Sequence, residues 1–308
     1  MLADQLTARR TRRRRHRPTR KQNLWALLFL GPWIIGLLVF TAGPMLVSLY
    51  LSFTDYSLLS APHWTGLANV RHMFTDPVFL KSLQVTLVYV GVGVPLELAF
   101  ALFVAVVLNR GMRGLGFYRS ALYLPSLFGG SVAVAVLWQR VFSGNGLVNE
   151  VLALVGIQGP AWISDPSYSL TTLIVLEVWQ FGAPMVIFLA GLRQIPQSYY
   201  DAAAVDGAST WRRFRHITLP LLSPVIFFNL VLQIIRGFQA FAPAFIVSNG
   251  TGGPVHSTLF YTLYLYQEGF VNFHMGYASA MAWFLLLIAA VLTAINFLLS
   301  RYWVHYGD

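Results

Sequence analysis

Six almost uninterrupted apolar stretches dominate the sequence. They cover residues 24–53, 83–108, 117–142, 170–192, 221–247 and 276–299. Each is long enough to cross the hydrocarbon core of a bilayer, which takes about 20 apolar residues in a helix. Because a bilayer offers no water to pair with backbone N–H and C=O groups, such stretches become helices. The sequence therefore predicts an all-α integral membrane protein with six transmembrane helices.

The composition agrees with this fold class. Of the 308 residues, 56% are hydrophobic and 10% are charged, whereas about 25% of the residues of a soluble domain are charged. So few charges leave too little polar surface to cover a globule in water. The chain has no cysteine, which excludes disulfides and thiolate metal sites, and its histidines lack metal-ligand spacing. We therefore expect no metal site and no cofactor in this chain.

The distribution of basic residues predicts the orientation of the spans. With a cytoplasmic N-terminus, 17 of the 21 lysines and arginines fall on the cytoplasmic side. Only Arg71, Lys81 and Arg140 then lie outside, and Arg236 lies within a span. Since cytoplasmic loops of membrane proteins are rich in Lys and Arg, we expect both termini to be cytoplasmic.

The chain is predicted to consist of a basic cytoplasmic tail (1–23), one membrane domain (24–301) and a cytoplasmic C-terminus (302–308). The net charge of +10 comes largely from the tail, because nine of the lysines and arginines lie in the first 21 residues. No interleaved aromatic residues or nucleic-acid-binding fold accompany this run. We interpret the tail as a determinant of topology that contacts the lipid bilayer, and we expect no nucleic-acid partner.

The cytoplasmic loop between the fourth and fifth stretches is patterned as two short helices separated by a break. Ser198 and Asp201 have the spacing of a capping box at the start of the first helix. Gly207 can adopt the positive φ that ends a helix, and Ser209 can cap the second helix. Pro220 is expected to end the second helix where the next span begins.

The second of these helices is amphipathic. Trp211, Phe214 and Ile217 fall at positions i, i+3 and i+6 and are expected to form one apolar face. Such a face suits a docking element for another protein, and it equally suits an interfacial helix that lies on lipid headgroups. Periodicity alone leaves both interpretations open.

This loop, residues 195–220, resembles the EAA loop of ABC-importer permeases. The family pattern is Glu-Ala-Ala, three residues, Gly, nine residues and Ile-x-Leu-Pro, and Asp201-Ala202-Ala203, Gly207 and Ile217-Thr218-Leu219-Pro220 stand at matching spacing. The fuller pattern is similar to the carbohydrate branch typified by the maltose and glycerol-phosphate permeases. The chain has Asp201 where the family has Glu. Aspartate keeps the negative charge, but its shorter side chain reaches less far toward an ATPase subunit.

The resemblance extends over nearly the whole chain. It is carried by Pro44, residues 52–56, Gly66-Leu67-x-Asn69, residues 118–125, Trp138, Gly146-Leu147-x-Asn149, Phe238-Gln239-x-Phe241, Gly252-Gly253-Pro254 and residues 275–280. The chain departs from the pattern at Ala242, where many members have Asp.

The resemblance implies a transport subunit and not an enzyme. It implies the permease of an ATP-driven importer for a sugar or small oligosaccharide in the bacterial plasma membrane. The implied partners are a second six-span permease, an ATPase homodimer that holds ATP and Mg, and an external sugar-binding protein. The chain itself lacks a Gly-x-x-x-x-Gly-Lys-Ser/Thr phosphate loop. The residues expected to couple to the ATPase are Asp201, Ala202, Ala203, Asp206, Gly207, Trp211, Phe214, Ile217, Leu219 and Pro220.

Polar and aromatic side chains within or near the spans are candidates for the substrate path. Intramembrane polar groups tend to face a bundle interior or a cavity, and aromatic rings can stack on a sugar. The candidates are Trp179, Gln180, Asn229, Gln233, Arg236, Phe238, Gln239 and Phe241. Glu97 and Glu177 also lie within spans. Each either lines the path or has a structural role, by pairing with Arg236 or by holding helices together.

Three rival functions are compatible with a membrane bundle. An ABC importer for another solute, such as glycerol-phosphate, is conceivable because Arg236 can contact a phosphate. A secondary transporter needs an ion-coupling site and usually an internal repeat, and the sequence shows neither. A membrane-embedded enzyme needs clustered nucleophiles, metal ligands or paired carboxylates, and the carboxylates in these spans are scattered. The sequence favours the sugar importer and does not name the sugar.

Overall fold

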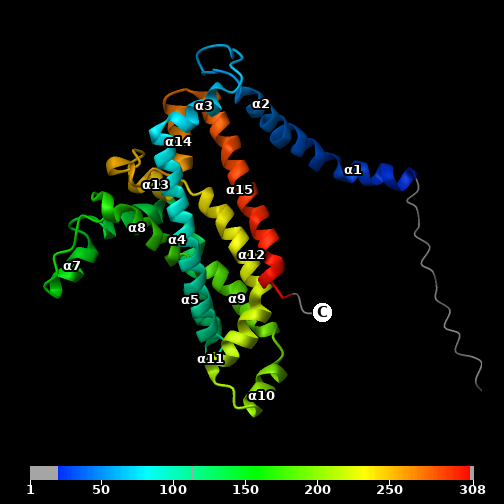
Figure 1. The fold of residues 1–308 in the computed structure, drawn as a ribbon, viewed down its shortest axis with the longest axis vertical. Helices are drawn as coiled ribbons and strands as arrows, with labels where there is room; N and C mark the ends of the chain where they lie inside the picture. The colour runs from blue at the N-terminus through cyan, green and yellow to red at the C-terminus, as the bar shows by residue number, and fades with distance from the viewer. Residues whose placement is uncertain (1–19, 112–113, 306–308) are drawn as a thin grey trace, which may run out of the picture. The chain divides into compact units, whose positions relative to one another are not determined.

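The computed structural model describes residues 20–111 and 114–305 (Figure 1). Within these residues every regular element is helical, and the only β-type pairing is an isolated bridge between Thr54 and Trp64. The all-α prediction is confirmed to this extent. Most of the predicted basic tail, Arg113 and the last residues of the predicted C-terminal segment lie outside the described residues.

The first part of the chain forms a unit of its own, which is a single helical stretch. It consists of α1 (Arg20–Leu37), the π-helical segment η1 (Leu38–Ala42) and α2 (Gly43–Leu51). Its apolar portion, Leu28–Leu51, is long enough to cross a membrane. The N–H of Gly43 bonds to the carbonyl of Leu38, five residues back. This wider turn leaves room for the ring of Pro44, which lacks an N–H of its own.

The rest of the chain forms a second compact unit with three long helices, α4 (Pro77–Leu108), α12 (Leu219–Phe238) and α15 (Met275–Trp303). The shorter elements are α3 (Ala68–Thr75), α5 (Leu115–Phe128), α6 (Val132–Val141), α7 (Leu147–Leu154), α8 (Pro166–Trp179), α9 (Gly182–Gln194), α10 (Gln197–Val205), α11 (Thr210–Arg213), η2 (Phe214–Thr218), α13 (Ala242–Val247), η3 (Pro254–His256), α14 (Tyr261–Tyr266) and η4 (Gln267–Val271).

Helix α4 is the centre of this second unit. It packs against α8, α9, α12 and α14, with α3 and α14 near one of its ends and α10 and α11 near the other (Figure 1). Its buried residues recur every three or four positions, as expected of a helix that turns one face toward its neighbours. Gly93, Ala101 and Ala105 lie on this face, and such small side chains let neighbouring helices approach closely.

The predicted spans are corrected at two places where single helices were expected. Four helices are individually long and apolar enough to cross a membrane, and two further candidates are bent pairs. Helices α5 and α6 meet at 96°, and α8 and α9 meet at 41°. Gly129 and Gly130 lie at the first break and Gly182 follows the second, and glycine is a poor helix former. The described chain therefore holds four to six spans, and six spans stay a prediction.

The fifth predicted stretch, residues 221–247, is also divided. Helix α12 ends at Phe238 and α13 begins at Ala242. Pro243 lies in the first turn of α13, a position where its missing N–H costs nothing, whereas within a helix it would remove a hydrogen bond. The chain therefore begins a new helix at this point.

Candidate functional site

Five polar side chains from three helices form an intramembrane polar cluster, consisting of Tyr89, Glu97, Glu177, Gln233 and Arg236. Helix α4 supplies the first two, α8 the third and α12 the last two. The amide Nε2 of Gln233 donates to Oε1 of Glu97 at 2.5 Å, and Nη1 of Arg236 donates to Oε1 of Gln233 at 3.1 Å. The hydroxyl of Tyr89 donates to Oε2 of Glu177 at 2.6 Å.

The cluster extends from the interior of the unit to its surface. Glu97 and Gln233 are 1% and 3% exposed, whereas Arg236 is exposed. Among the described residues, Oε2 of Glu97 has no hydrogen-bond partner. A buried polar atom without a partner costs about 1–3 kcal/mol, so this oxygen can accept a hydroxyl or a water.

Arg236 does not pair directly with Glu97 or Glu177, although both carboxyl groups accept hydrogen bonds from neighbouring helices. Of the two structural roles that the sequence left open, the ion pair is therefore wrong. In residues 28–111 and 114–305, whose side chains are described, the only contact between opposite charges at salt-bridge distance is that of His274 with Glu268. Gln233 connects Arg236 to Glu97 instead, because an amide can accept from a guanidinium and donate to a carboxyl group at the same time. The guanidinium thereby stays at the exposed end of the cluster.

Three other predicted path residues of the α12 region differ in exposure. Asn229 and Phe238 are each 2% exposed. Asn229 donates to the carbonyl of Val225 at 3.0 Å, and Phe238 belongs to the apolar core. Gln239 caps the end of α12 and is exposed. Of these three, only Gln239 presents its side chain to the surroundings of the chain.

The remaining path candidates lie at helix breaks. Trp179 ends α8, lies 5.9 Å from the ring of Trp138, and lines a cavity of about 400 Å³ at the break between α5 and α6. Gln180 is buried, and its backbone carbonyl accepts from the hydroxyl of Ser126 at 2.7 Å. Phe241 stacks on Phe245 with ring centroids 5.2 Å apart. By their contacts, the eight candidates thus form separate groups and not a single site.

The predicted two-helix loop is present as α10 and α11, near the end of α4 that lies opposite to α3 and α14 (Figure 1). Gly207 has a φ of 70°, and the Oγ of Ser209 accepts from the N–H of Arg212 at 3.3 Å, as predicted. The predicted capping box is wrong, because α10 begins directly after Pro196 and places Ser198 inside the helix. Proline presets a backbone φ that suits entry into a helix.

The predicted capping box would have paired the side chain of Asp201 with Ser198. Instead, its Oδ1 accepts from Nε2 of Gln197 at 3.1 Å. Asp201, Ala202, Asp206 and Gly207 are all exposed. The outer surface of α10 and the turn after it is therefore free for another chain, as far as the described residues show.

Pro220 does not end the second helix, so this expectation is wrong. The chain stays helical from Thr210 to Phe238. In the π-helical segment η2, the N–H of Leu219 bonds to the carbonyl of Phe214, five residues back. This wide turn leaves room for the proline ring, which in an α-helix would collide with the carbonyl four residues earlier.

The apolar face predicted for Trp211, Phe214 and Ile217 is divided. Trp211 and Phe214 stack with ring centroids 5.7 Å apart and line a cavity of about 630 Å³ against α4. Ile217 lines a different cavity, together with Ala203. The π-helical turn changes the angle between successive residues, so positions i, i+3 and i+6 no longer share one face.

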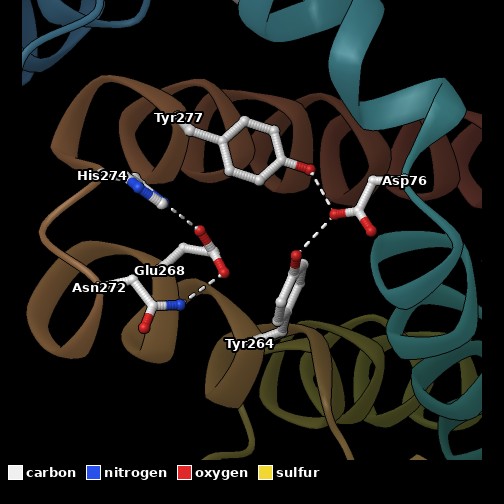
Figure 2. A network of polar contacts seen from close by, with 6 residues as sticks. All are labelled: Asp76, Tyr264, Glu268, Asn272, His274 and Tyr277. Atoms are coloured by element: carbon white, nitrogen blue, oxygen red, sulfur yellow. Dashed lines mark hydrogen bonds and ion pairs between the residues drawn. The ribbon is translucent and has the colours of Figure 1, made fainter.

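A second polar cluster, which was not predicted from the sequence, lies at the opposite end of α4 around Asp76. Its Oδ2 accepts from the hydroxyls of Tyr264 at 2.6 Å and Tyr277 at 3.0 Å (Figure 2). Its Oδ1 caps α4, because it accepts from the N–H of Val78. Burial raises the pKa of Asp76, but hydrogen bonds from both tyrosines and from the backbone outweigh it and hold the pKa below its usual value. The signal in the sequence was Asp before Pro77, a common start of a helix.

The neighbouring turn is held by Glu268, which lies in η4. Its Oε1 accepts from Nδ2 of Asn272 at 2.9 Å, and its Oε2 lies 2.8 Å from Nδ1 of His274 (Figure 2). Burial and the hydrogen bond to Asp76 raise the pKa of Tyr264, so this residue stays a hydrogen-bond donor. The two groups together connect the start of α4 to the turn between α14 and α15.

The chain matches the model of a protein family over residues 77–304. This region includes the intramembrane polar cluster and the two-helix loop. The family is described as the binding-protein-dependent transport system inner membrane component. The chain belongs to this family. It is therefore a multi-pass membrane subunit of an ABC importer, a permease and not a catalytic enzyme.

Similar proteins carry the same general description. The permease is 54% identical to YesP of Bacillus subtilis (strain 168), a probable ABC transporter permease, and the match covers 95% of this chain and 96% of YesP. It is 35% identical to LacF of Rhizobium radiobacter, a lactose transport system permease, over 89% of this chain and 93% of LacF.

The fold of the permease is also found in a solved structure. A bacterial alginate ABC transporter, crystallised in complex with an alginate pentasaccharide-bound periplasmic protein, contains a chain that matches with a TM-score of 0.78. The match covers 94% of the permease and 98% of that chain, at 22% sequence identity. At this identity the likeness shows the fold alone.

Proposed function

We propose that this permease forms half of the translocation path of an importer for a sugar or small oligosaccharide in the bacterial plasma membrane. The observation that carries the proposal is the 35% identity to a lactose permease over 89% of the chain. Six spans with both termini in the cytoplasm complete the proposed topology, in agreement with the positive-inside distribution of Lys and Arg.

The intramembrane polar cluster suits a path for sugars. The unpartnered Oε2 of Glu97 can accept a hydroxyl, and the exposed guanidinium of Arg236 can donate to one. Trp179 and Phe241 offer ring faces on which the apolar face of a pyranose can stack. Gln233 links the carboxyl group of Glu97 and the guanidinium of Arg236 through two hydrogen bonds. A sugar that contacts one of these groups can therefore shift the position of the other.

The two-helix loop is proposed to dock on a separate ATPase homodimer, which binds ATP and Mg. The exposed residues Asp201, Ala202, Asp206 and Gly207 form the surface that we assign to this contact. A second six-span permease would complete the membrane part, and an external sugar-binding protein would deliver the substrate. The pentasaccharide-bound periplasmic protein in the alginate transporter complex supports the last of these partners.

Isolation of the complex tests the docking proposal. Wild-type permease, extracted mildly from native membranes, should bring down an ATPase and a second permease. Gly207→Pro should lose the ATPase and keep the second permease, because proline cannot adopt the φ of 70° found at this position. Gly156→Pro is a matched control, since Gly156 also has a positive φ and donates to the carbonyl three residues back, in an exposed turn outside the loop. Loss of the ATPase in both variants would contradict the assignment.

Transport by the reconstituted complex tests the substrate class. The complex is reconstituted in the membrane of proteoliposomes, with the binding protein outside and ATP inside. These proteoliposomes should accumulate a labelled mono- or oligosaccharide. An importer for glycerol-phosphate is the second candidate, because the exposed Arg236 can bind a phosphate. Uptake of glycerol-phosphate that Arg236→Gln abolishes, without uptake of any sugar, would replace the sugar proposal.

A further inference from the structure

A groove on the surface of the second unit lies between the end of α4 and the start of the helical segment at Thr210. It has two adjoining compartments, of about 630 Å³ and about 220 Å³. Val106, Arg110, Thr210 and Phe214 line both, so the two compartments meet at these side chains. We call this surface the α4–α11 groove, and its volume lies in the range of about 300–1,000 Å³ that is typical of ligand sites.

The larger compartment is apolar. From α4 it is lined by Ala99, Phe103 and Val107, which lie four residues apart on one helix face, and from the other wall by Trp211 and Phe214. Phe103 is 63% exposed and Trp211 is 68% exposed. Large aromatic side chains that open into an apolar groove of a membrane-spanning helix are suited to a hydrocarbon ligand.

The smaller compartment carries the basic side chains of the groove. Asn109, Arg110, Arg213 and the hydroxyl-bearing Tyr200 contribute to its lining. Among the side chains described, those of residues 28–111 and 114–305, neither arginine has an acidic partner at salt-bridge distance. This end of the groove therefore presents two guanidinium groups that form no salt bridge with a described carboxylate, although Asp206 lines a neighbouring cavity together with Arg213. Guanidinium is well suited to bind phosphate.

We propose that the α4–α11 groove binds a phospholipid with an anionic headgroup. An acyl chain would lie along α4 in the larger compartment, and the phosphate would lie between Arg110 and Arg213 in the smaller one. The order of the compartments follows the profile of a bilayer leaflet, because the apolar lining of α4 ends at Val107 and Arg110 follows one turn later. In the orientation proposed above this is the cytoplasmic leaflet, where anionic lipids attract basic residues.

The charge distribution favours this occupant over two others. A free phosphate would leave the apolar compartment unfilled, and a zwitterionic lipid would bring no net negative charge to the two guanidinium groups, because its ammonium group cancels the charge of its phosphate. The lipid would connect α4, the central helix of the unit, to the segment that follows α10. The proposal does not depend on the substrate of the importer.

Native mass spectrometry of the purified complex, supplied with phosphatidylglycerol, tests the basic compartment. Wild type should retain one phosphatidylglycerol at this site. The double variant Arg110→Gln/Arg213→Gln should bind it about 30-fold more weakly, since each basic residue near a membrane surface contributes about a fivefold gain in affinity for anionic lipid. Arg193→Gln/Arg215→Gln removes two exposed arginines that line neither compartment, and it should retain the lipid. Equal loss in both double variants, or no loss in either, would overturn the proposal.

A filling substitution tests the apolar compartment without a change of charge. Ala99→Phe should occupy part of the groove and reduce the retained phosphatidylglycerol. Ala290→Phe adds the same ring at an exposed position of α15 outside the groove, and it should leave retention unchanged. Full retention in Ala99→Phe would show that the acyl chain does not lie in this compartment.

A photo-crosslinking side chain at Phe103 identifies what fills the groove in native membranes. The expected product is the permease carrying the mass of one phospholipid with an anionic headgroup. A product joined to a peptide of another protein would show that the groove is a protein interface and would overturn the proposal. A product joined to phosphatidylethanolamine in proportion to its abundance would show unselective lipid contact, which also overturns it.

Discussion

At the scale of single residues, the structure differs from expectation most clearly at Gln233. A charged residue in a span is usually matched with an opposite charge, and Arg236 was the available cation for Glu97. The neutral amide of Gln233 takes that place, one helical turn before the arginine. Glu97 therefore depends on Gln233 for its only hydrogen bond among the described residues.

We expect Gln233→Leu to destabilise the permease by about 1–3 kcal/mol, because it leaves the buried carboxyl group of Glu97 without a partner. The double variant Gln233→Leu/Glu97→Leu should recover most of this loss, since replacing both polar groups by apolar ones is nearly neutral. Equilibrium unfolding in detergent measures both. A double variant as unstable as the single one would show that the hydrogen bond is not the cause.

Asp76 predicts a dependence of stability on pH. Its pKa is lower in the folded chain than in the unfolded chain, so the unfolded chain binds more protons between the two values. The stability that Asp76 contributes is thus fully present above about pH 4, the ordinary value of an aspartate, and is lost as the pH falls through the folded pKa.

Thermal unfolding between pH 5 and pH 3 should show this loss in wild type. Asp76→Asn should flatten the acid side of the curve, because asparagine keeps a helix cap without the titration. Tyr277→Phe removes one donor to the carboxylate and should reduce the slope by less. An acid side that is unchanged in Asp76→Asn would assign the loss to other groups.

At the scale of elements, the breaks within the predicted spans depend on close helix contacts as well as on local sequence. A side-chain carbon placed on Gly182, the first residue of α9, would lie 2.6 Å from the carbonyl of Leu122 and 2.8 Å from Cα of Tyr123. The hydroxyl of Ser126 also bridges the break, as it donates to Gln180 and accepts from the N–H of Ala183. Helix α5 therefore packs directly on the start of α9.

We expect Gly182→Ala to destabilise the permease by about 1–3 kcal/mol, the usual cost of overpacking, because the atoms it would meet belong largely to the backbone. Gly116→Ala, on the same α5, has no heavy atom within 4 Å of the new carbon and should be neutral or slightly stabilising. Thermal unfolding in one detergent compares the two. A Gly182→Ala variant as stable as wild type would show that α5 can move away from α9.

At the scale of the whole molecule, the number of spans decides where the C-terminal region lies. The absence of cysteine makes every introduced thiol unique in the chain. Ala61 and Tyr302 are both exposed, and in the proposed six-span topology they lie on opposite sides of the membrane.

A membrane-impermeant maleimide should therefore label Ala61→Cys in intact cells or spheroplasts, and it should label Tyr302→Cys only after permeabilisation. Labelling of both residues from outside would require an even number of spans between Ala61 and Tyr302, whereas the proposed topology has an odd number there. It would also contradict the orientation inferred from the basic residues.

Properties that depend on solvent or on adjacent residues could be predicted from the sequence. The apolar stretches require lipid as solvent, which determines the all-α class, and the loop motif was sufficient to predict the family. The positive φ of Gly207 and the cap at Ser209 are equally local, because they involve residues within three positions of each other.

Only the tertiary structure showed which side chains form hydrogen bonds with residues far away in the sequence. Glu97 and Gln233 are 136 residues apart, and Asp76 and Tyr277 are 201 residues apart. Periodicity also could not predict the π-helical turn at η2, which carries the helix past Pro220 and separates Ile217 from Trp211 and Phe214. Hydrophobic patterning specifies which faces are buried but not which side chains meet there, since many pairings bury the same apolar area.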